Sequence, residues 1–155
     1  MALLNLVIRF AASDAGRAVD RFAVRWTGES LMNAMFSRLT KSAYNKPLLL
    51  TTIGAKTGQK RTVVLPFFEV DGKIVVVGSR GGMPEDPFWA RNMRVNSRIW
   101  IRIDRKLRDA TARLATGEER QQLWDAITVR EKVYIAYQER AKPYRELPFF
   151  VLTPA

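Results

Sequence analysis

The sequence predicts an α+β fold: a small, partly closed barrel of about six mainly antiparallel strands with peripheral helices. Three observations predict it. Apolar residues recur at helical spacing over residues 1–40, short apolar stretches separated by turns follow from residue 47, and two helical stretches precede a last strand. Consecutive hairpins favour an antiparallel sheet over βαβ units. The 155 residues contain no repeat or linker, so we expect one domain, 1–155, with a helical segment, 1–40, and a barrel, 47–155.

The helical segment is predicted to hold three helices. We expect Asp14 to cap the second, Thr27 and Gly28 to form a break, and Ser30 or Glu29 to open the third. We favour the interpretation that their apolar stripes pack on the core. The alternative is contact with a membrane surface, because arginines stand among large apolar residues, as in interfacial helices. The stripes are Leu4, Val7, Ile8 and Ala11, then Val19, Phe22, Ala23 and Trp26, then Leu31, Ala34, Met35 and Leu39; the arginines are Arg9, Arg17, Arg21 and Arg25.

Turn signals divide the barrel into strands. Pro66 indicates a bulge or an edge, and Asp71–Gly72 is the strongest hairpin signal in the chain. A T-x-x-E capping box at residues 116–119 predicts a helix start. We expect strands over 48–53, 61–70, 73–79, 98–103, 107–114 and 149–152, a short helix over about 87–95, and a second late helix that carries Val133, Tyr134 and Tyr137.

Composition removes several kinds of chemistry. The chain has no cysteine and no histidine, which excludes disulfides, thiolate or histidine metal sites and histidine-based triads. We expect no metal, so any chemistry must come from carboxylates, hydroxyls, cations, amides or a bound cofactor. The apolar run at residues 2–8 is far shorter than the ~20 residues that span a bilayer, and it lacks the features of a secretory signal. We expect a cytoplasmic protein, with contact at the inner face of the cell membrane as the open alternative.

The net charge of +11 indicates an anionic partner. It is unevenly spread, with +4 over residues 1–46, +6 over 47–110 and +1 over 111–155, so the middle of the chain is the best candidate for an anion site. A basic nucleic-acid-binding domain is one alternative. Basic residues are not interleaved with aromatic side chains as stacking platforms require, and no nucleic-acid-binding motif is present, so we expect no nucleic acid.

Four segments could carry chemistry. The turn 54–61, Gly-Ala-Lys-Thr-Gly-Gln-Lys-Arg, has two glycines, a hydroxyl, three cations and no acid, which suits an anion, although a solvated hairpin tip explains it equally well. Residues 79–82, Ser-Arg-Gly-Gly, put a cation at a strand end or form a flexible loop. In the short helix, Trp89 and Asn92 share a face beside basic residues, although a core tryptophan is the simpler explanation. Tyr134 and Tyr137 are explained most simply by packing.

In order along the chain, these segments resemble the deazaflavin-dependent nitroreductase family, which includes actinobacterial quinone reductases that use reduced coenzyme F420. The shared order is G-x-K-[ST]-G-x-x-R, a D-G hairpin, G-S-x-G-G, P-x-W-x-x-N and a late Tyr-x-x-Tyr-Gln helix, over about residues 47–155. The resemblance implies a split β-barrel like that of FMN-binding oxidases. It also implies an oxidoreductase that transfers a hydride from reduced coenzyme F420 to a quinone-like or nitroaromatic acceptor, with the protein supplying orientation and electrostatics.

The resemblance further implies roles for single residues. Tyr134 would face the acceptor, and Ser79 would be a second catalytic donor. The turn would hold the phosphodiester and acidic tail of the cofactor, residues 79–82 would lie beside its ring and tail, and the short helix would close over it. The implied cofactor-binding residues are Lys56, Thr57, Gly58, Arg61, Ser79, Arg80, Gly81, Gly82, Trp89 and Asn92.

At two positions this chain has a different residue from the members of the family that it resembles. Arg80 stands where many members have Lys or Asn. Glu131 stands where the nitroimidazole-activating member has a second tyrosine one helical turn before Tyr134. An acid beside an apolar acceptor would change the choice of substrate, so whether nitroimidazoles are reduced stays open. Within the same fold, the alternatives are an oxidoreductase that binds FMN and a cofactor binder without turnover. A peripheral membrane module without catalysis and the nucleic-acid-binding domain are the alternatives of other classes, and the oligomeric state is open.

Overall fold

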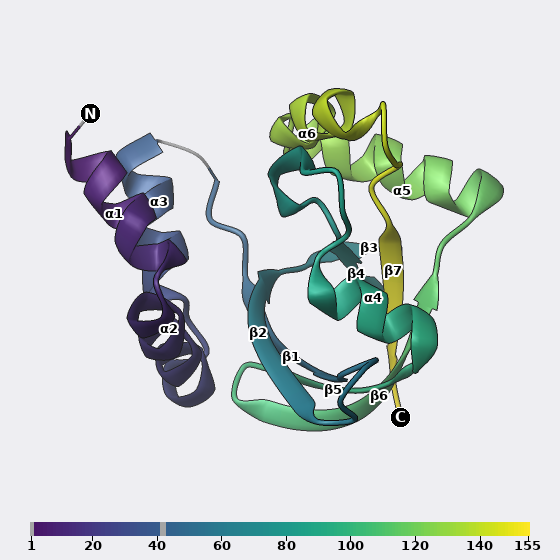
Figure 1. Cartoon of the computed structure of the whole chain (residues 1–155), viewed down its shortest axis with the longest axis horizontal. Coiled ribbons are helices and arrows are strands. Elements are labelled where there is room, and N and C mark those ends of the chain that lie inside the picture. Colours follow the sequence, from purple (N-terminus) through teal and green to yellow (C-terminus); the bar gives the residue numbers. More distant parts are fainter. Residues whose placement is uncertain (1, 41–42) are drawn as a thin grey trace.

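The computed structural model describes residues 2–40 and 43–155 (Figure 1). Residues 1, 41 and 42 and the side chains of residues 2–4 and 40 lie outside the described residues, and so does Leu4 of the first predicted stripe. The helices are α1 (Ala2–Ala12), α2 (Asp14–Thr27), α3 (Leu31–Thr40), the one-turn 3-10 helix η1 (Arg80–Gly82), α4 (Phe88–Val95), α5 (Gly117–Arg130) and α6 (Val133–Ala141). The strands are β1 (Pro47–Ile53), β2 (Lys60–Pro66), β3 (Phe68–Val70), β4 (Lys73–Val77), β5 (Arg98–Ile103), β6 (Lys106–Leu114) and β7 (Phe149–Pro154).

The strands form one curled antiparallel sheet in the order β2-β1-β5-β6-β7-β4-β3. Figure 1 shows α1–α3 on one side of the sheet, α4 across its open side, and α5 and α6 together at one end. This is the predicted α+β barrel with peripheral helices. Seven strands are present instead of about six, because the stretch predicted as one strand, 61–70, is divided.

Pro66 explains that division. β2 pairs with β1 up to the pair Pro47↔Pro66, and β3 pairs with β4 from Phe68↔Val75. Proline has no N–H to continue a ladder, and at Phe67 the backbone N–H donates to the carbonyl of Lys46 at 3.2 Å. The chain therefore changes partner at this point, and two consecutive strands end at opposite ends of the strand order.

Two hairpins have two-residue turns with left-handed backbone. Asp71 and Gly72, at φ 49° and 74°, join β3 to β4 and confirm the predicted hairpin. Asp104 and Arg105, at φ 48° and 67°, join β5 to β6 in the same way. The second turn has Asp104 but no glycine, so it lacks the Asp-Gly pair that marks such a hairpin most strongly.

Alternate residues of β7 divide the apolar core into two clusters. Phe150 belongs to the cluster enclosed by the curled sheet and α4, and Phe149 belongs to the cluster under α5 and α6. Adjacent side chains of a strand point to opposite faces, so β7 is buried on both of its faces. The sheet is thus held between α4 on one side and the two late helices on the other.

The helix start predicted at residues 116–119 is correct, but the capping box is not formed. Thr116 is the N-cap residue of α5, yet its side chain makes no capping hydrogen bond. Glu119 turns to two cations instead: Oε2 accepts from Arg113 at 2.6 Å, and Oε1 accepts from Lys73 at 3.0 Å. Arg113 on β6 and Lys73 on β4 are positively charged, whereas the N-cap backbone N–H is neutral, so the Glu119 carboxylate binds the two cations.

The N-terminal helices are fixed by a buried carboxylate. Asp20 of α2 accepts from the hydroxyl of Ser30 at 2.8 and 3.0 Å and from the backbone N–H of Met32 at 3.2 Å. Ser13, not the predicted Asp14, caps α2, since its hydroxyl accepts from the N–H of Gly16 at 3.0 Å. Gly28 ends α2 with φ 81°, as the predicted break requires.

The interpretation that the apolar stripes pack on the core is wrong for most of their side chains. Because Asp20 must reach Ser30, α2 turns Asp20, Ala23 and Val24 inward, which leaves Phe22 67% and Trp26 61% exposed. Val7 and Ala23 are the buried members of the predicted stripes within the described residues. The exposed members are Ile8, Val19, Phe22, Trp26, Leu31, Met35 and Leu39. No helix in the ranges 2–40 and 43–155 is long and apolar enough to cross a membrane.

Candidate functional site

A cavity of about 740 Å³ lies between the turn 54–61, α4 and α2. Thr57, Thr62 and Asn92 give its wall polar groups, and Val63 and Phe88 give it apolar surface. Among the described residues that line it there are five cations and no carboxylate, and none of the five forms an ion pair within the described part of the chain. The cations are Arg21, Lys56, Lys60, Arg61 and Arg91.

Glycines shape the turn at the rim of this cavity. The backbone N–H of Gly54 donates to the carbonyl of Gln59 at 2.8 Å, and the N–H of Gly58 donates to the carbonyl of Gly54 at 2.8 Å. Gly58 has φ +67°, a conformation that glycine adopts without strain. The amides of Lys56 and Thr57 have no acceptor among residues 2–40 and 43–155, so they are available to a ligand.

Asn92 fastens the turn to α4. Its Oδ1 accepts from the backbone N–H of Ala55 at 2.9 Å, and its Nδ2 donates to Oγ1 of Thr52 at 2.9 Å. Trp89, one turn earlier, is buried in the core with its ring edge-on to Phe150 at 6.3 Å. The helix therefore presents Trp89 to the core, Asn92 to the turn, and Arg91 to the cavity.

Aromatic rings and one amide hold three of the cavity cations in place. Lys60 Nζ lies 3.8 Å from the centroid of the Trp100 ring, and the guanidinium of Arg91 lies 4.5 Å from that of Phe88. Arg61 donates to Oε1 of Gln59 at 3.1 Å. These partners orient the cations without neutralising them, so the cavity keeps a positive potential suited to a polyanion.

Ser79, Arg80, Gly81 and Gly82 form a second cluster, beside α6 and outside the lining of the cavity. They make a tight turn in which Arg80, Gly81 and Gly82 have φ of 44°, 62° and 78°. A Cβ at Gly82 would lie 2.5 Å from the carbonyl oxygen of Tyr137, so only glycine fits there. Arg80 pairs with Glu85 at 3.1 Å. The loop is closely packed against α6.

Tyr134 lies on α6, buried beneath the late helices. Its ring is edge-on to Phe68 at 5.8 Å and to Tyr137 at 6.0 Å. Burial, and then the charge of Glu131 and the neighbouring Tyr137, raise the pKa of the Tyr134 hydroxyl, which therefore stays protonated at neutral pH. Glu131 itself accepts from Nδ2 of Asn45 at 2.7 Å. Tyr134 is thus packed in the core, as the sequence indicated, and its hydroxyl is protonated.

The structure brings four of the predicted site residues into the cavity lining: Lys56, Thr57, Arg61 and Asn92. It places Ser79–Gly82 and Tyr134 at the α6 end, Trp89 in the core, and Gly58 within the turn but outside the lining. Arg21 of α2 was not predicted here. The spacing of residues around Arg21 indicated only an amphipathic helix. Nothing in the local sequence shows that its side chain lies near the turn 54–61.

Comparisons with known proteins identify the family of the chain. The profile of a family described as F420H(2)-dependent quinone reductase matches residues 29–154. The chain belongs to this family. An F420H(2)-dependent quinone reductase of Mycobacterium tuberculosis is 33% identical over 109 residues, which cover 68% of this chain and 72% of the relative. The predicted resemblance is therefore confirmed, and with it an F420H(2)-dependent quinone reductase activity.

Solved structures confirm the split-barrel fold of this quinone reductase family member. The structure of an F420-H2-dependent reductase superposes with a TM-score of 0.60 at 36% identity, covering 68% of this chain and 92% of that one. The heme storage protein HutZ from Vibrio cholerae superposes with a TM-score of 0.51 at 18% identity, covering 72% of this chain and 82% of its own, and shows the fold alone.

The residues present fit the F420 coenzyme. The family implies an anionic cofactor with a phosphodiester and an acidic tail, and the cavity offers five cations that no carboxylate within the described chain neutralises. Free amides at Lys56 and Thr57 add donors of the kind that bind phosphate oxygens. When bound, the reduced deazaflavin supplies a hydride.

Proposed function

We propose that the cavity between the turn 54–61, α4 and α2 binds the phosphodiester and acidic tail of reduced coenzyme F420. The observation that carries this proposal is the concentration around one cavity of five cations that form no ion pair within the described part of the chain. Lys56 and Arg61 provide charge, Thr57 provides a hydroxyl, and Asn92 holds the turn in shape through Ala55. Gly58 keeps the turn compact through its left-handed backbone.

At the α6 end, we assign Ser79 and Tyr134 to the acceptor. Reduction of a quinone builds negative charge on its oxygen, and a donor placed there stabilises the charge as it develops. The raised pKa of Tyr134 keeps its hydroxyl in the donor form. The Ser79 hydroxyl has no partner among residues 2–40 and 43–155, so it is free to donate. Arg80, Gly81 and Gly82 shape the loop that carries Ser79, and Trp89 supports α4 from the core.

A quinone is the proposed acceptor, in preference to a nitroimidazole. Glu131 puts a carboxylate one helical turn before Tyr134, and Asn45 holds that carboxylate at 2.7 Å. An acid at this position offers a flat nitroimidazole ring less apolar surface than the tyrosine of the nitroimidazole-activating member does. A nitroaromatic acceptor without an imidazole remains within the proposed substrate range.

The cofactor assignment is tested by titrating the purified chain with coenzyme F420 and with FMN, following tryptophan fluorescence. We expect submicromolar to micromolar binding of the deazaflavin, weakened by salt because exposed charges are screened within about 10 Å at 0.1 M salt. In Lys56→Gln and Arg61→Gln, Kd should rise about tenfold to a hundredfold, since hydrogen bonds to charged groups contribute roughly 1.5–3 kcal/mol. Tighter binding of FMN, or an unchanged Kd in both variants, contradicts the assignment; Lys106→Gln is the matched control.

We further propose that α1–α3 touch an anionic membrane surface, at the inner face of the cell membrane. Leu6, Phe22 and Trp26 are each more than 60% exposed, and the guanidinium of Arg25 lies 6.0 Å from the Trp26 ring. Large apolar groups next to arginines are the pairing that interfacial helices use. The number of large exposed apolar side chains on these helices supports the proposal, and liposome binding, described in the Discussion, tests it.

A further inference from the structure

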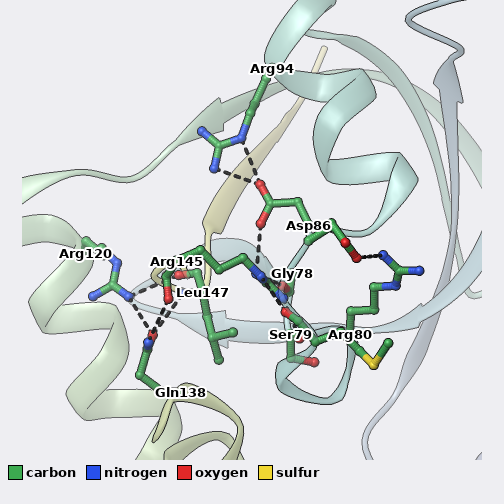
Figure 2. Close-up of polar contacts among 11 residues, drawn as sticks. Gly78, Ser79, Arg80, Asp86, Arg94, Arg120, Gln138, Arg145 and Leu147 are labelled. Atoms are coloured by element: carbon green, nitrogen blue, oxygen red, sulfur yellow. Dashed lines mark hydrogen bonds and ion pairs between the residues drawn. The ribbon is translucent and has the colours of Figure 1, made fainter. Parts of the chain in front are cut away.

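The guanidinium of Arg145 lies directly behind the loop that carries Ser79 (Figure 2). It donates to three main-chain carbonyls of that loop: Nη1 to Gly78 at 2.9 Å, Nη2 to Ser79 at 2.8 Å and Nε to Met83 at 2.9 Å. Its side chain is only 10% exposed. One planar group from the segment after α6 therefore holds both ends of the loop.

The charge of Arg145 is balanced locally. Nη1 also donates to Oδ1 of Asp86 at 2.8 Å, and Asp86 in turn pairs with Arg94 of α4 at 3.1 Å. Figure 2 shows the Asp86 carboxylate between the two arginines. The chain of contacts runs from the segment after α6 through the loop to α4, the helix that lines the cofactor cavity.

The loop adopts a conformation that needs such support. Arg80, Gly81 and Gly82 follow one another with positive φ, which a non-glycine residue such as Arg80 adopts only where its surroundings impose it. Arg140 adds a fourth contact, from Nη1 to the carbonyl of Gly81 at 2.8 Å. Two arginines thus take up four carbonyls of a six-residue stretch.

Binding the carbonyls also orients the amides. Peptide groups are planar and trans, so an N–H points away from the carbonyl that precedes it. The carbonyl of Ser79 faces Arg145, and the N–H of Arg80 therefore faces away from it. That N–H has no acceptor in the described part of the chain, so the loop presents it to a ligand together with the Ser79 hydroxyl.

We propose that Arg145 is a positioning residue for catalysis: by binding the carbonyls of Gly78, Ser79 and Met83 it fixes the Ser79 hydroxyl and the Arg80 amide where the cofactor and acceptor meet. The inference rests on the proposed function of that loop. Geometry makes arginine necessary here, because a guanidinium has five donors in a rigid fork whereas a lysine ammonium is a single point charge. Lysine would keep the charge opposite Asp86 and lose most of the carbonyl contacts.

The test compares Arg145→Lys with the wild-type chain, with Arg113→Lys as the control. Arg113, on β6, also binds a carboxylate, that of Glu119 in the first turn of α5, and within the described part of the chain it contacts no loop carbonyl. We expect Arg145→Lys to speed amide hydrogen exchange at residues 79–83 at least tenfold while exchange in β1 stays unchanged. The same variant should lower kcat for a quinone such as menadione about tenfold, and the control should change neither quantity.

A second substitution separates positioning from general stability. In the Arg145→Lys background, Arg80→Gly should slow exchange at residues 79–83 again, because glycine adopts positive φ without strain. Asp86→Asn keeps the three carbonyl contacts and should change loop exchange less than threefold. If Arg145→Lys does not fold, amide exchange in Asp86→Asn tests the proposal instead. Exchange at residues 79–83 of Asp86→Asn as fast as in an unfolded chain would overturn it, because the carbonyl contacts alone would not fix the loop.

Two outcomes overturn the proposal in a folded Arg145→Lys variant. Unchanged loop exchange shows that Arg145 does not fix the loop, and faster exchange with normal kcat shows that the fixed loop is irrelevant to the reaction. Failure of the proposed cofactor site has a different signature. It appears as an unchanged coenzyme Kd in Lys56→Gln and Arg61→Gln, two residues that do not contact the loop.

Discussion

The carboxamide oxygen of Asn92 accepts a hydrogen bond from the backbone N–H of Ala55 at 2.9 Å. This bond joins α4 to the turn 54–61, two elements separated by 37 positions in the chain. Asn92 is therefore a link between the fold and the cofactor site.

Asn92→Ala should weaken coenzyme binding without removing any ligand contact of the turn itself. The buried side chain loses two hydrogen bonds, which together contribute about 1–3 kcal/mol to stability. We expect a lower melting temperature and a coenzyme Kd raised several-fold, measured by thermal denaturation and fluorescence titration. Gln122→Ala, which removes an exposed amide on α5, is the control. An unchanged Kd in a folded Asn92→Ala chain would show that the turn holds its shape alone.

Arg21 is expected to contribute to cofactor binding although it lies on the N-terminal helices. It lines the cavity together with Lys56 and Arg61. Arg21→Gln should raise the coenzyme Kd about threefold to tenfold and reduce its dependence on salt, because one screened charge is removed. Arg17→Gln removes a charge one helical turn earlier that pairs with Asp14 at 2.6 Å, and it should leave Kd unchanged. Equal effects of the two variants would indicate only a general loss of positive charge.

The sequence predicts those features of the fold that depend on neighbouring residues, and it does not predict those that depend on residues far apart in the chain. The hairpin at Asp71–Gly72, the break at Gly28 and the start of α5 at Gly117 are short-range features, and all three were predicted. Pro66 indicated a bulge or an edge, but the division of the strand at Phe67 was not predicted, because it depends on which strand each half pairs with. Periodicity alone does not give that information.

The same distinction applies to the site. Lys56, Thr57 and Arg61 occupy one turn, so their grouping is visible in the sequence. Arg21 and Arg145 act across long separations: Arg145 contacts Gly78 over 67 positions. The inward face of α2 was also mispredicted, because the buried pair Asp20 and Ser30 rotates the helix away from its most apolar stripe. A polar contact between two helices overrode the hydrophobic pattern.

The exposed apolar side chains of α2 are expected to carry the membrane contact. The double variant Phe22→Ser, Trp26→Ser removes two large groups that are more than 60% exposed, so the fold should be retained. Co-sedimentation with vesicles of anionic phospholipid should fall at least fivefold, since burying one such side chain contributes about 1.5–3 kcal/mol. Val129→Ser on α5, which is 78% exposed, is the matched control. Equal sedimentation of all three proteins would refute a role for α2.

Glu119 should stabilise the fold in a pH-dependent way. Arg113 and Lys73 lower its pKa from the ordinary 4.5 to about 2. A carboxyl with a lowered pKa contributes stability that is complete above its unfolded pKa and disappears as the pH falls through its folded pKa. Glu119→Gln should therefore reduce the free energy of unfolding by about 1 kcal/mol at pH 7. The difference should shrink below about pH 4.5 and vanish near pH 2.

Urea denaturation at several pH values measures this effect. Glu118→Gln, in the same first turn of α5, removes an exposed carboxylate whose contact is a bond from Gln122 at 3.3 Å, and it should change stability little at any pH. A constant difference between Glu119→Gln and wild type from pH 7 to pH 2 would mean that the ion pairs with Arg113 and Lys73 contribute nothing.

Tyr134→Phe should impair reduction of the acceptor while leaving cofactor binding intact. The substitution removes only the hydroxyl, so the edge-on packing against Phe68 and Tyr137 persists. Loss of one transition-state hydrogen bond worth about 1.4 kcal/mol lowers kcat/KM about tenfold. Steady-state kinetics with menadione measure this loss of kcat/KM. Tyr144 is an exposed tyrosine just after α6, and Tyr144→Phe is the control.

The pH profile distinguishes this donor role from a role in packing. Burial and the charge of Glu131 raise the pKa of Tyr134 above that of an ordinary tyrosine, so the donor form persists beyond pH 10. The ratio of kcat/KM between wild type and Tyr134→Phe should therefore stay constant from pH 7 to about pH 10. A ratio that falls towards one across this range would mean that the hydroxyl ionises as an exposed group does. Normal kcat/KM with a raised coenzyme Kd would instead assign Tyr134 to the cofactor.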